Sequence, residues 1–210
     1  MNAVFYQCML RMNTDDKTAS DQAYLTAAQQ SSGRGYLMYN CTVTSTTPGV
    51  DTASETRSKP GYLGRPWMAN TSEVVFYYTV VETTDYPDAK GKSLIVPQGW
   101  NNTLGGESPK MYEYGTIEIS GEDNGTGRAG WSKLLSTKKI DDGATDISIK
   151  AFLGDWTDEL NARGLVLELT EDQMNHDASN PATGIPGVAA VAALAAIAGA
   201  SILVAKKKRR

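Results

Sequence analysis

The chain has very little histidine and cysteine. Its 210 residues include one histidine, His176, and two cysteines, Cys8 and Cys41. Zinc and most transition metals are held by several histidine, cysteine or carboxylate ligands at characteristic spacings, and the sequence contains no such cluster. His176 lies in a polar stretch, residues 171–179, which we interpret as a solvated linker. We therefore expect no metal site.

The two cysteines leave the redox environment open. Cys8 and Cys41 could pair as a disulfide in an oxidising exterior, or both could be buried free thiols in equivalent positions of two strands. We favour the free thiols.

Basic residues are scarce outside the last five positions. The chain has 20 Lys and Arg against 24 Asp and Glu, for a net charge of −4. Residues 206–210 supply five of these 20 basic side chains, so the rest of the chain has 15 against 24, or −9. Nucleic-acid binding requires Lys and Arg to neutralise phosphates, and we therefore expect no nucleic-acid partner.

The N-terminus lacks the pattern of a signal peptide, because no charged segment followed by an apolar core is present. The C-terminus has a different pattern. Residues 180–184 (Asn-Pro-Ala-Thr-Gly) precede an uncharged apolar run, 185–205, and the basic residues 206–210 follow. The apolar run of 21 residues would reach about 30 Å as a helix, enough to span a bilayer. The basic cluster would stay on the cytoplasmic side, so the body of the protein would lie outside.

This tail resembles a sortase cell-wall sorting signal. The resemblance implies cleavage between Thr183 and Gly184 and attachment of the new C-terminus to peptidoglycan. The protein would then be extracellular and anchored to the wall or membrane of a Gram-positive-type bacterium. Asn180 stands where the common motif has Leu, and a permanent membrane anchor is the alternative. An exported protein with such a tail and no signal peptide is expected to be incomplete at its N-terminus.

Short aromatic segments recur along the chain. They span residues 4–8, 37–41 and 74–79. Cys8 and Cys41 are 33 residues apart, and Cys41 and Thr79 are 38 residues apart. The stretches between the segments are polar and have no helical periodicity. Such β-rich units suggest the stacked coils of a solenoid with parallel strands, although the spacing alone also fits an antiparallel sandwich.

Residues 61–67, Gly-Tyr-Leu-Gly-Arg-Pro-Trp, combine a cation and an indole in a short, rigid segment. Gly64 allows backbone angles that a side chain would forbid, while Pro66 fixes its own φ and favours an extended Arg65. Arg65 offers planar donors to a carboxylate, and Trp67 offers a flat apolar face to a sugar ring. The segment indicates that a carboxylate and a carbohydrate lie nearby. The alternative is a turn with an exposed Arg65 and a packed Trp67.

The Leu-Gly-Arg-Pro-Trp segment resembles the signature of pectin methylesterases, also called pectinesterases. The resemblance runs in the family's order over residues 1–157. Its other landmarks are the segments 4–8, 24–29, 35–44, 74–77, 95–100, 112–115, 131–135 and 152–156. It implies an all-β fold, a right-handed parallel β-helix that is truncated at its N-terminus. This domain would be followed by an extension and polar linker, 158–179, and by the sorting tail with its apolar helix, 180–210.

In pectinesterases, a nucleophilic Asp in an Asp-[Phe/Tyr]-Ile-Phe-Gly motif attacks the methyl ester of pectin homogalacturonan. A second Asp, in a Gln-Asp-Thr motif, protonates the departing methanol. The resemblance implies that Arg65 hydrogen-bonds to the nucleophilic carboxylate and that Trp67 lines the substrate subsite beside it. Neither Asp motif occurs in this chain. We do not expect any of four other acidic residues to take the place of the two catalytic Asp residues: Asp15, Asp16, Asp21 and Asp51. We therefore expect a monomeric pectinesterase fragment that is inactive alone.

Other positions are weaker candidates. Glu113 and Tyr114 would point to opposite faces of a strand, so at most one of them would face a substrate groove. The three tryptophans expected to be structural are Trp100, Trp131 and Trp156. Residues 147–153 are predicted to form a last strand, and residues 158–169 a helix followed by a short strand.

Two other functions compete with the esterase. The first is a non-catalytic cell-surface module that binds polysaccharide. The second is a β-helical pectate lyase, which needs a Ca²⁺-binding cluster of carboxylates that the sequence does not display.

Overall fold

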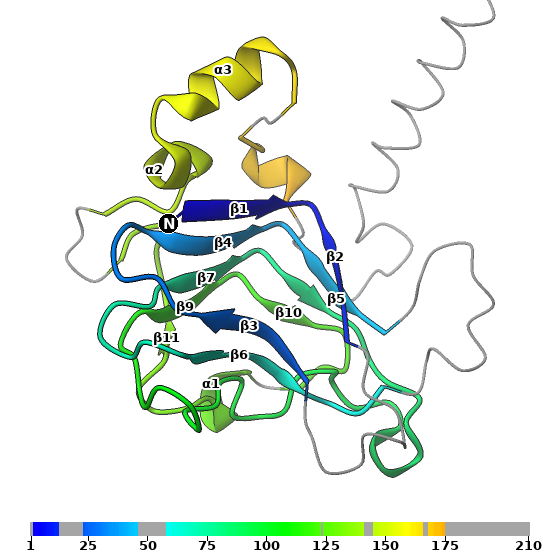
Figure 1. Ribbon diagram of the computed structural model, residues 1–210. Coiled ribbons are helices and arrows are strands. Elements are labelled where there is room, and N and C mark those ends of the chain that lie inside the picture. The colour runs from blue at the N-terminus through cyan, green and yellow to red at the C-terminus, as the bar shows by residue number, and fades with distance from the viewer. Residues whose placement is uncertain are drawn as a thin grey trace, which may run out of the picture.

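A computed structural model describes residues 2–12, 23–45, 58–122, 124–140, 145–165 and 168–174. Its described part consists mostly of strands in parallel sheets, with few helices (Figure 1). The helical elements are α1 (Asn124–Gly127), α2 (Ile149–Leu153), α3 (Trp156–Ala162) and the short 3₁₀ turns η2 (Pro87–Ala89) and η3 (Glu171–Gln173). The expected all-β class is confirmed at this level.

The strands form three sheets, named here A, B and C. Sheet A has the order β1 (Asn2–Tyr6), β4 (Gly35–Tyr39), β7 (Val74–Tyr77), β9 (Met111–Tyr114) and β11 (Lys133–Leu134). Sheet B has the order β10 (Ile117–Glu118), β8 (Val80–Val81), β5 (Thr42–Thr44) and β2 (Met9–Arg11). Sheet C pairs β3 (Tyr24–Ala28) with β6 (Tyr62–Pro66).

The chain passes through the sheets in the repeating order A, B, C. It runs through β1, β2 and β3, then β4, β5 and β6, then β7 and β8. Single bridges from Gly61 to Ile95 and from Gly64 to Trp100 then place the segment after β8 beside β6. All pairs between the named strands are parallel, so the antiparallel sandwich considered from the sequence is wrong.

The chain bends from sheet A to sheet B four times, each time at a residue with positive φ. Gln7, Asn40 and Tyr78 occupy the first three bends with φ of 50°, 51° and 50°, and Gly115 occupies the fourth with φ of 64°. Positive φ is uncommon for residues other than glycine, so the surrounding packing must hold these three in place. The repeat of the aromatic segments predicted from the sequence is thereby confirmed, because the residue before each bend is a tyrosine of the sheet A register.

Sheet A separates two apolar cores. The inner core, between the sheets, includes Phe76, Leu63 and Trp100. The outer core lies on the other face of sheet A, where Ile149 and Phe152 of α2 cover it. Figure 1 shows α2 and α3 above β1, at the edge of sheet A.

A ladder of tyrosines crosses this outer core. Tyr6, Tyr39, Tyr77 and Tyr114 stack in sequence, with ring centroids 5.5, 5.2 and 5.5 Å apart. The backbone N–H of Leu169 donates to the hydroxyl of Tyr39 at 2.9 Å. Burial raises the pKa of Tyr77 to about 12, so the hydroxyl of Tyr77 stays protonated over the ordinary pH range.

The predicted strand at 147–153 is wrong, because most of this segment forms helix α2. Ser148 caps the helix by accepting a hydrogen bond from Ala151 N–H at 3.0 Å, and such a cap favours a helix start. The helix predicted within 158–169 is present as α3, but the described residues of that range contain no strand.

Both cysteines are free thiols in the structure. Cys41 is buried, as expected, whereas Cys8 is only half-buried. No helix in the described ranges is both long and apolar enough to cross a bilayer. The apolar run 185–205 lies outside those ranges.

Candidate functional site

The sequence-predicted site lies on sheet C, where β6 pairs with β3. The register places Tyr24 opposite Tyr62 and Ala27 opposite Arg65. Both strands lie at the front of the molecule in Figure 1. The site is therefore built on paired strands rather than on a loop alone.

Gly64 allows the two strands to approach closely. A Cβ at this position would lie 1.9 Å from Thr26 Oγ1 and 2.8 Å from the Thr26 carbonyl oxygen. The Thr26 hydroxyl donates to the Leu63 carbonyl at 2.9 Å, which holds its side chain over the glycine. The sequence predicted that Gly64 is needed for its backbone freedom. In the structure, its lack of a side chain is more important, because it leaves room for Thr26 on the neighbouring strand.

We expect Gly64→Ala to destabilise the chain by about 1–3 kcal/mol, because the methyl group would displace Thr26 and overpack the pair of strands. The matched control is Gly130→Ala, since no heavy atom lies within 4 Å of a Cβ there. That control should change the free energy of unfolding by less than about 0.5 kcal/mol. Urea unfolding of both variants checks this, and equal effects would contradict the close approach at Gly64.

Arg65 is half-buried and lies against aromatic side chains. Its guanidinium carbon is 4.1 Å from the centroid of the Tyr24 ring. Tyr24 in turn stacks on Tyr62, with centroids 5.3 Å apart and planes 10° apart. The Nε atom of Arg65 is buried and has no hydrogen-bond partner. Arg65 forms no ion pair with a carboxylate in the part of the chain that the structure describes.

Trp67 follows β6 directly and is 50% exposed. Its backbone N–H donates to the Ala28 carbonyl at 2.8 Å, which fixes it at the end of β3. A Cβ on Gly105 would lie 2.1 Å from the Pro66 carbonyl oxygen, so the loop around residue 105 lies directly against this backbone. The packed-tryptophan alternative is wrong for Trp67, and the structure brings an exposed indole and a half-buried cation to one end of sheet C.

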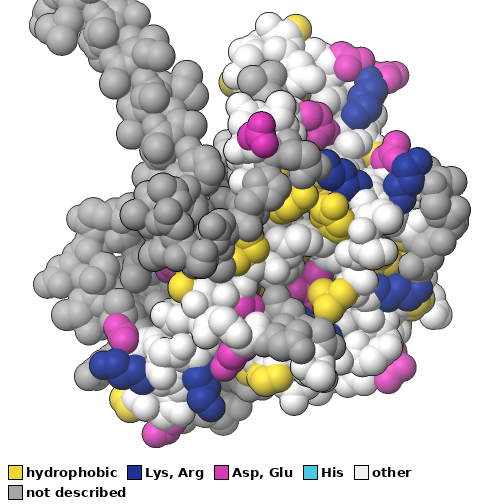
Figure 2. Space-filling view, turned by 180° about the vertical axis from the view of Figure 1, so that it is seen from behind, with side chains coloured by type: hydrophobic (Ala, Val, Ile, Leu, Met, Phe, Trp, Pro, Cys, Tyr) yellow, Lys and Arg dark blue, Asp and Glu magenta, His cyan; other side chains and the backbone are white. Residues whose placement is uncertain are grey.

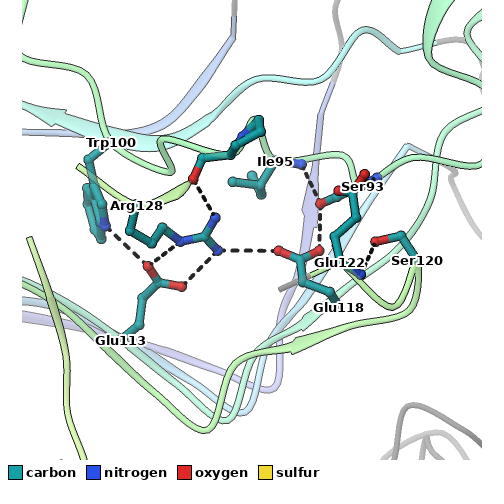
Figure 3. Close-up of polar contacts among 9 residues, drawn as sticks. Ser93, Ile95, Trp100, Glu113, Glu118, Ser120, Glu122 and Arg128 are labelled. Carbon is teal, nitrogen blue, oxygen red and sulfur yellow. Dashed lines mark hydrogen bonds and ion pairs between the residues drawn. The ribbon is translucent and has the colours of Figure 1, made fainter. Parts of the chain in front are cut away.

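Glu113 does not face a groove. Its side chain is 1% exposed, and its carboxylate takes a bidentate contact from Arg128, with Nε–Oε1 at 2.8 Å and Nη2–Oε2 at 3.1 Å. Arg128 Nη2 also contacts Glu118 Oε1 at 3.3 Å, and Trp100 Nε1 donates to Glu113 at 3.4 Å. Figure 3 shows Arg128 between the two carboxylates, with Ser93 bonded to the far oxygen of Glu118. These five residues form a closed interior network, called here the Arg128 network.

The Arg128 network is short of positive charge. Two carboxylates share one guanidinium, whose side chain is 6% exposed. Burial raises the pKa of Glu118, and the Ser93 hydroxyl and the charge of Arg128 only partly offset this. The network can stabilise the fold, but its side chains are too buried to bind a substrate.

The other candidates are dispersed. Trp100 is buried in the inner core and Trp131 packs against it, so both are structural as expected. Trp156, expected to be structural, is instead 59% exposed on α3. Tyr114 belongs to the tyrosine ladder of sheet A.

Several predicted positions lie outside the described residues. They are Asp15, Asp16, Asp21, Asp51, His176, Thr183, Gly184 and the whole tail 180–210. Within the described ranges, no group of three or more His, Cys, Asp or Glu side chains could hold a metal ion. On the face seen from behind in Figure 2, the described Lys and Arg side chains lie beside acidic ones rather than in one basic patch.

The sequence did not single out Tyr24 and Tyr62 as members of the site. A tyrosine in each of two segments was the only signal, and nothing local indicates that these segments pair. Comparison with known proteins adds no further information, since the chain matches no family model, no curated protein and no solved structure.

Proposed function

We propose that this chain is the C-terminal part of a pectinesterase, which hydrolyses the methyl esters of homogalacturonan to pectate and methanol. The proposal includes a right-handed parallel β-helix as its fold. The repeated order of sheets A, B and C and the purely parallel pairing of the named strands support that fold. The tyrosine ladder supports it too, because stacked coils place like residues above one another.

One observation carries the functional proposal. Arg65 lies over the ring of Tyr24 with its Nε buried and unpaired, and the half-exposed indole of Trp67 follows two residues later at the end of β6. A buried donor without an acceptor is costly, so such a donor at the end of a sheet suits a site that an external carboxylate completes. An indole beside it suits a sugar ring.

The proposed chemistry needs two carboxyl groups. A carboxylate attacks the ester carbonyl carbon, and the tetrahedral intermediate expels methanol after a second carboxyl group donates a proton to the methoxy oxygen. The resulting acyl-enzyme anhydride is then opened by water, and the second carboxylate takes the proton of that water. Arg65 would orient the attacking carboxylate and keep it ionised, because a nearby cation lowers the pKa of an acid. No cofactor takes part.

The proposal is tested by reading the DNA upstream of the Met1 codon and assaying the product. An open frame encoding Gln-Asp-Thr and then Asp-[Phe/Tyr]-Ile-Phe-Gly supports it, if the joined product releases methanol from methyl-esterified pectin. A stop codon directly before Met1, or a joined product that folds and releases no methanol, would overturn it.

A non-catalytic module that binds polysaccharide is the second candidate. It is favoured by the absence of any carboxylate on Arg65 among the described residues, combined with the exposure of Trp67. This alternative predicts that the joined product still binds pectin and releases no methanol.

We also propose that the tail is a sorting signal that links the protein to peptidoglycan. Cells that express the chain with its native export signal should yield wall fragments in which the protein ends at Thr183. Mass spectrometry of the C-terminal peptide checks this. A peptide that continues past Gly184 would indicate a permanent membrane anchor instead.

A further inference from the structure

We infer that Tyr24 is a positioning residue for Arg65. Its ring, supported by Tyr62, holds the guanidinium flat and leaves the in-plane donors of Arg65 to bind an acidic ligand. The identity of this ligand as a uronate rests on the polysaccharide-binding candidate under the proposed function, because the esterase candidate gives the same donors to the nucleophilic carboxylate. The positioning role does not rest on it.

The geometry of sheet C carries this inference. Tyr24 and Tyr62 are register partners, and their rings are stacked at 5.3 Å with an interplanar angle of 10°. Arg65 lies three residues after Tyr62, and its guanidinium carbon is 4.1 Å from the Tyr24 centroid. A guanidinium over a ring is attracted through its face, so the contact uses none of its N–H donors.

Other arginines of the chain are held differently. Arg34 also lies over a ring, 4.3 Å from the centroid of Phe152, but its Nε donates to Glu73 at 3.0 Å. Arg128 gives its donors to Glu113 and Glu118. The Nη2 of Arg34 and the Nε of Arg65 are both buried without a hydrogen-bond acceptor, but Arg34 has an ion pair with Glu73, whereas Arg65 has none among the described residues.

The buried Nε of Arg65 is a donor that lacks a partner in the described part of the chain. Water does not reach this donor, and the described residues offer it no acceptor. A ligand carboxylate would satisfy it only after the atoms that cover Nε move aside, and it would then bind in the bidentate manner that arginine favours. The tyrosine pair would thus hold the donors in place before the ligand arrives, which lowers the ordering cost of binding.

The test uses NMR of the full chain with four variants. Tyr24→Phe keeps the ring and removes the hydroxyl, whereas Tyr24→Leu removes the ring. Tyr6→Leu is the matched control, because Tyr6 stacks on Tyr39 at 5.5 Å in sheet A. Arg65→Lys keeps the charge and removes the planar donors. The readouts are the ring-current shift of the Arg65 Nε–H signal and the Kd for trigalacturonate, with neutral maltotriose as the comparison ligand.

We expect the wild type, Tyr24→Phe and Tyr6→Leu to share the shifted Nε–H signal and the same Kd. Tyr24→Leu should lose the shift and bind trigalacturonate about 5-fold more weakly, with maltotriose binding unchanged. Arg65→Lys should also weaken binding of the charged ligand alone.

Two results would overturn the inference. One is an unshifted Nε–H signal in the wild type, which needs no variant and so holds even if Tyr24→Leu fails to fold. The other is a Tyr24→Phe variant that loses as much affinity as Tyr24→Leu. If the signal is shifted and Tyr24→Leu abolishes the shift, but the wild type does not bind trigalacturonate, the positioning role stands and the proposed uronate ligand is wrong.

Discussion

Replacing Arg128 with methionine should destabilise the chain by about 3–5 kcal/mol, since it leaves buried carboxylates without their partner. Glu113 and Glu118 have side chains 1% and 2% exposed, and both contact this guanidinium. Methionine fills similar space but supplies no donor. Urea unfolding followed by tryptophan fluorescence measures the effect.

The matched control is Arg163→Met. Arg163 pairs with Glu159 one helical turn away on α3, with side chains 64% and 56% exposed. Water screens this pair, so its loss should cost less than about 1 kcal/mol. Similar losses in the two variants would mean that the Arg128 network contributes no more than a surface ion pair.

The Arg128 network should also make stability depend on pH. Because burial raises the pKa of Glu118 above its ordinary value of 4.5, the folded chain holds this proton more tightly than the unfolded chain does. The resulting stabilisation is fully present below the ordinary pKa and is lost as the pH rises through the raised value. Glu118→Gln should remove this part of the dependence. Unfolding free energies of both proteins between pH about 4.5 and 7 check the prediction, and parallel curves would contradict it.

Parallel stacking could be predicted from the sequence because like residues recur in it. The segments ending at Cys8 and Cys41 match in their aromatic and cysteine positions, and parallel strands in register place such residues side by side. The bend itself could not be predicted. It is formed by Gln7, Asn40 and Tyr78, of which only the asparagine has a local tendency to positive φ.

The sequence of helix α2 predicts a strand because its apolar run is too short for hydrophobic periodicity to distinguish a helix from a strand. The buried side chains at 147 and 149 fit the alternation of a strand, whereas those at 149 and 152 have the spacing of a helix. Ser148, which caps the helix, is the local signal in the sequence that favours a helix.

The candidate site could be predicted only where its residues are neighbours in the sequence. Arg65 and Trp67 belong to one segment, and the structure places them together at the end of β6. Tyr24 lies near Arg65 because β3 pairs with β6. Glu113 is buried because it forms an ion pair with Arg128 in the interior. Contacts between strands far apart in the sequence depend on which strands pair, and no local pattern encodes that pairing.

If the proposed function is correct, Arg65→Ala should reduce methanol release by the complete enzyme on the order of 100-fold. A misplaced nucleophile loses about this much when its orienting contact is removed. The loss should fall on kcat, because Arg65 would hold the attacking carboxylate, while Trp67→Ala should act mainly on KM. Arg163→Ala, on the exposed surface of α3, is the control and should keep full activity.

The same Arg65 substitution should leave the fold nearly unchanged. The Nε of Arg65 has no hydrogen bond to lose, and among the described residues its side chain makes a cation–π interaction with Tyr24, worth about 0.5–1 kcal/mol at a partly exposed site. Activity and stability therefore separate at this residue, in contrast to Arg128, where the main effect is on stability. A folded Arg65→Ala enzyme with wild-type methanol release would refute the proposed role of Arg65, and it would leave the polysaccharide-binding module as the better explanation of the exposed Trp67.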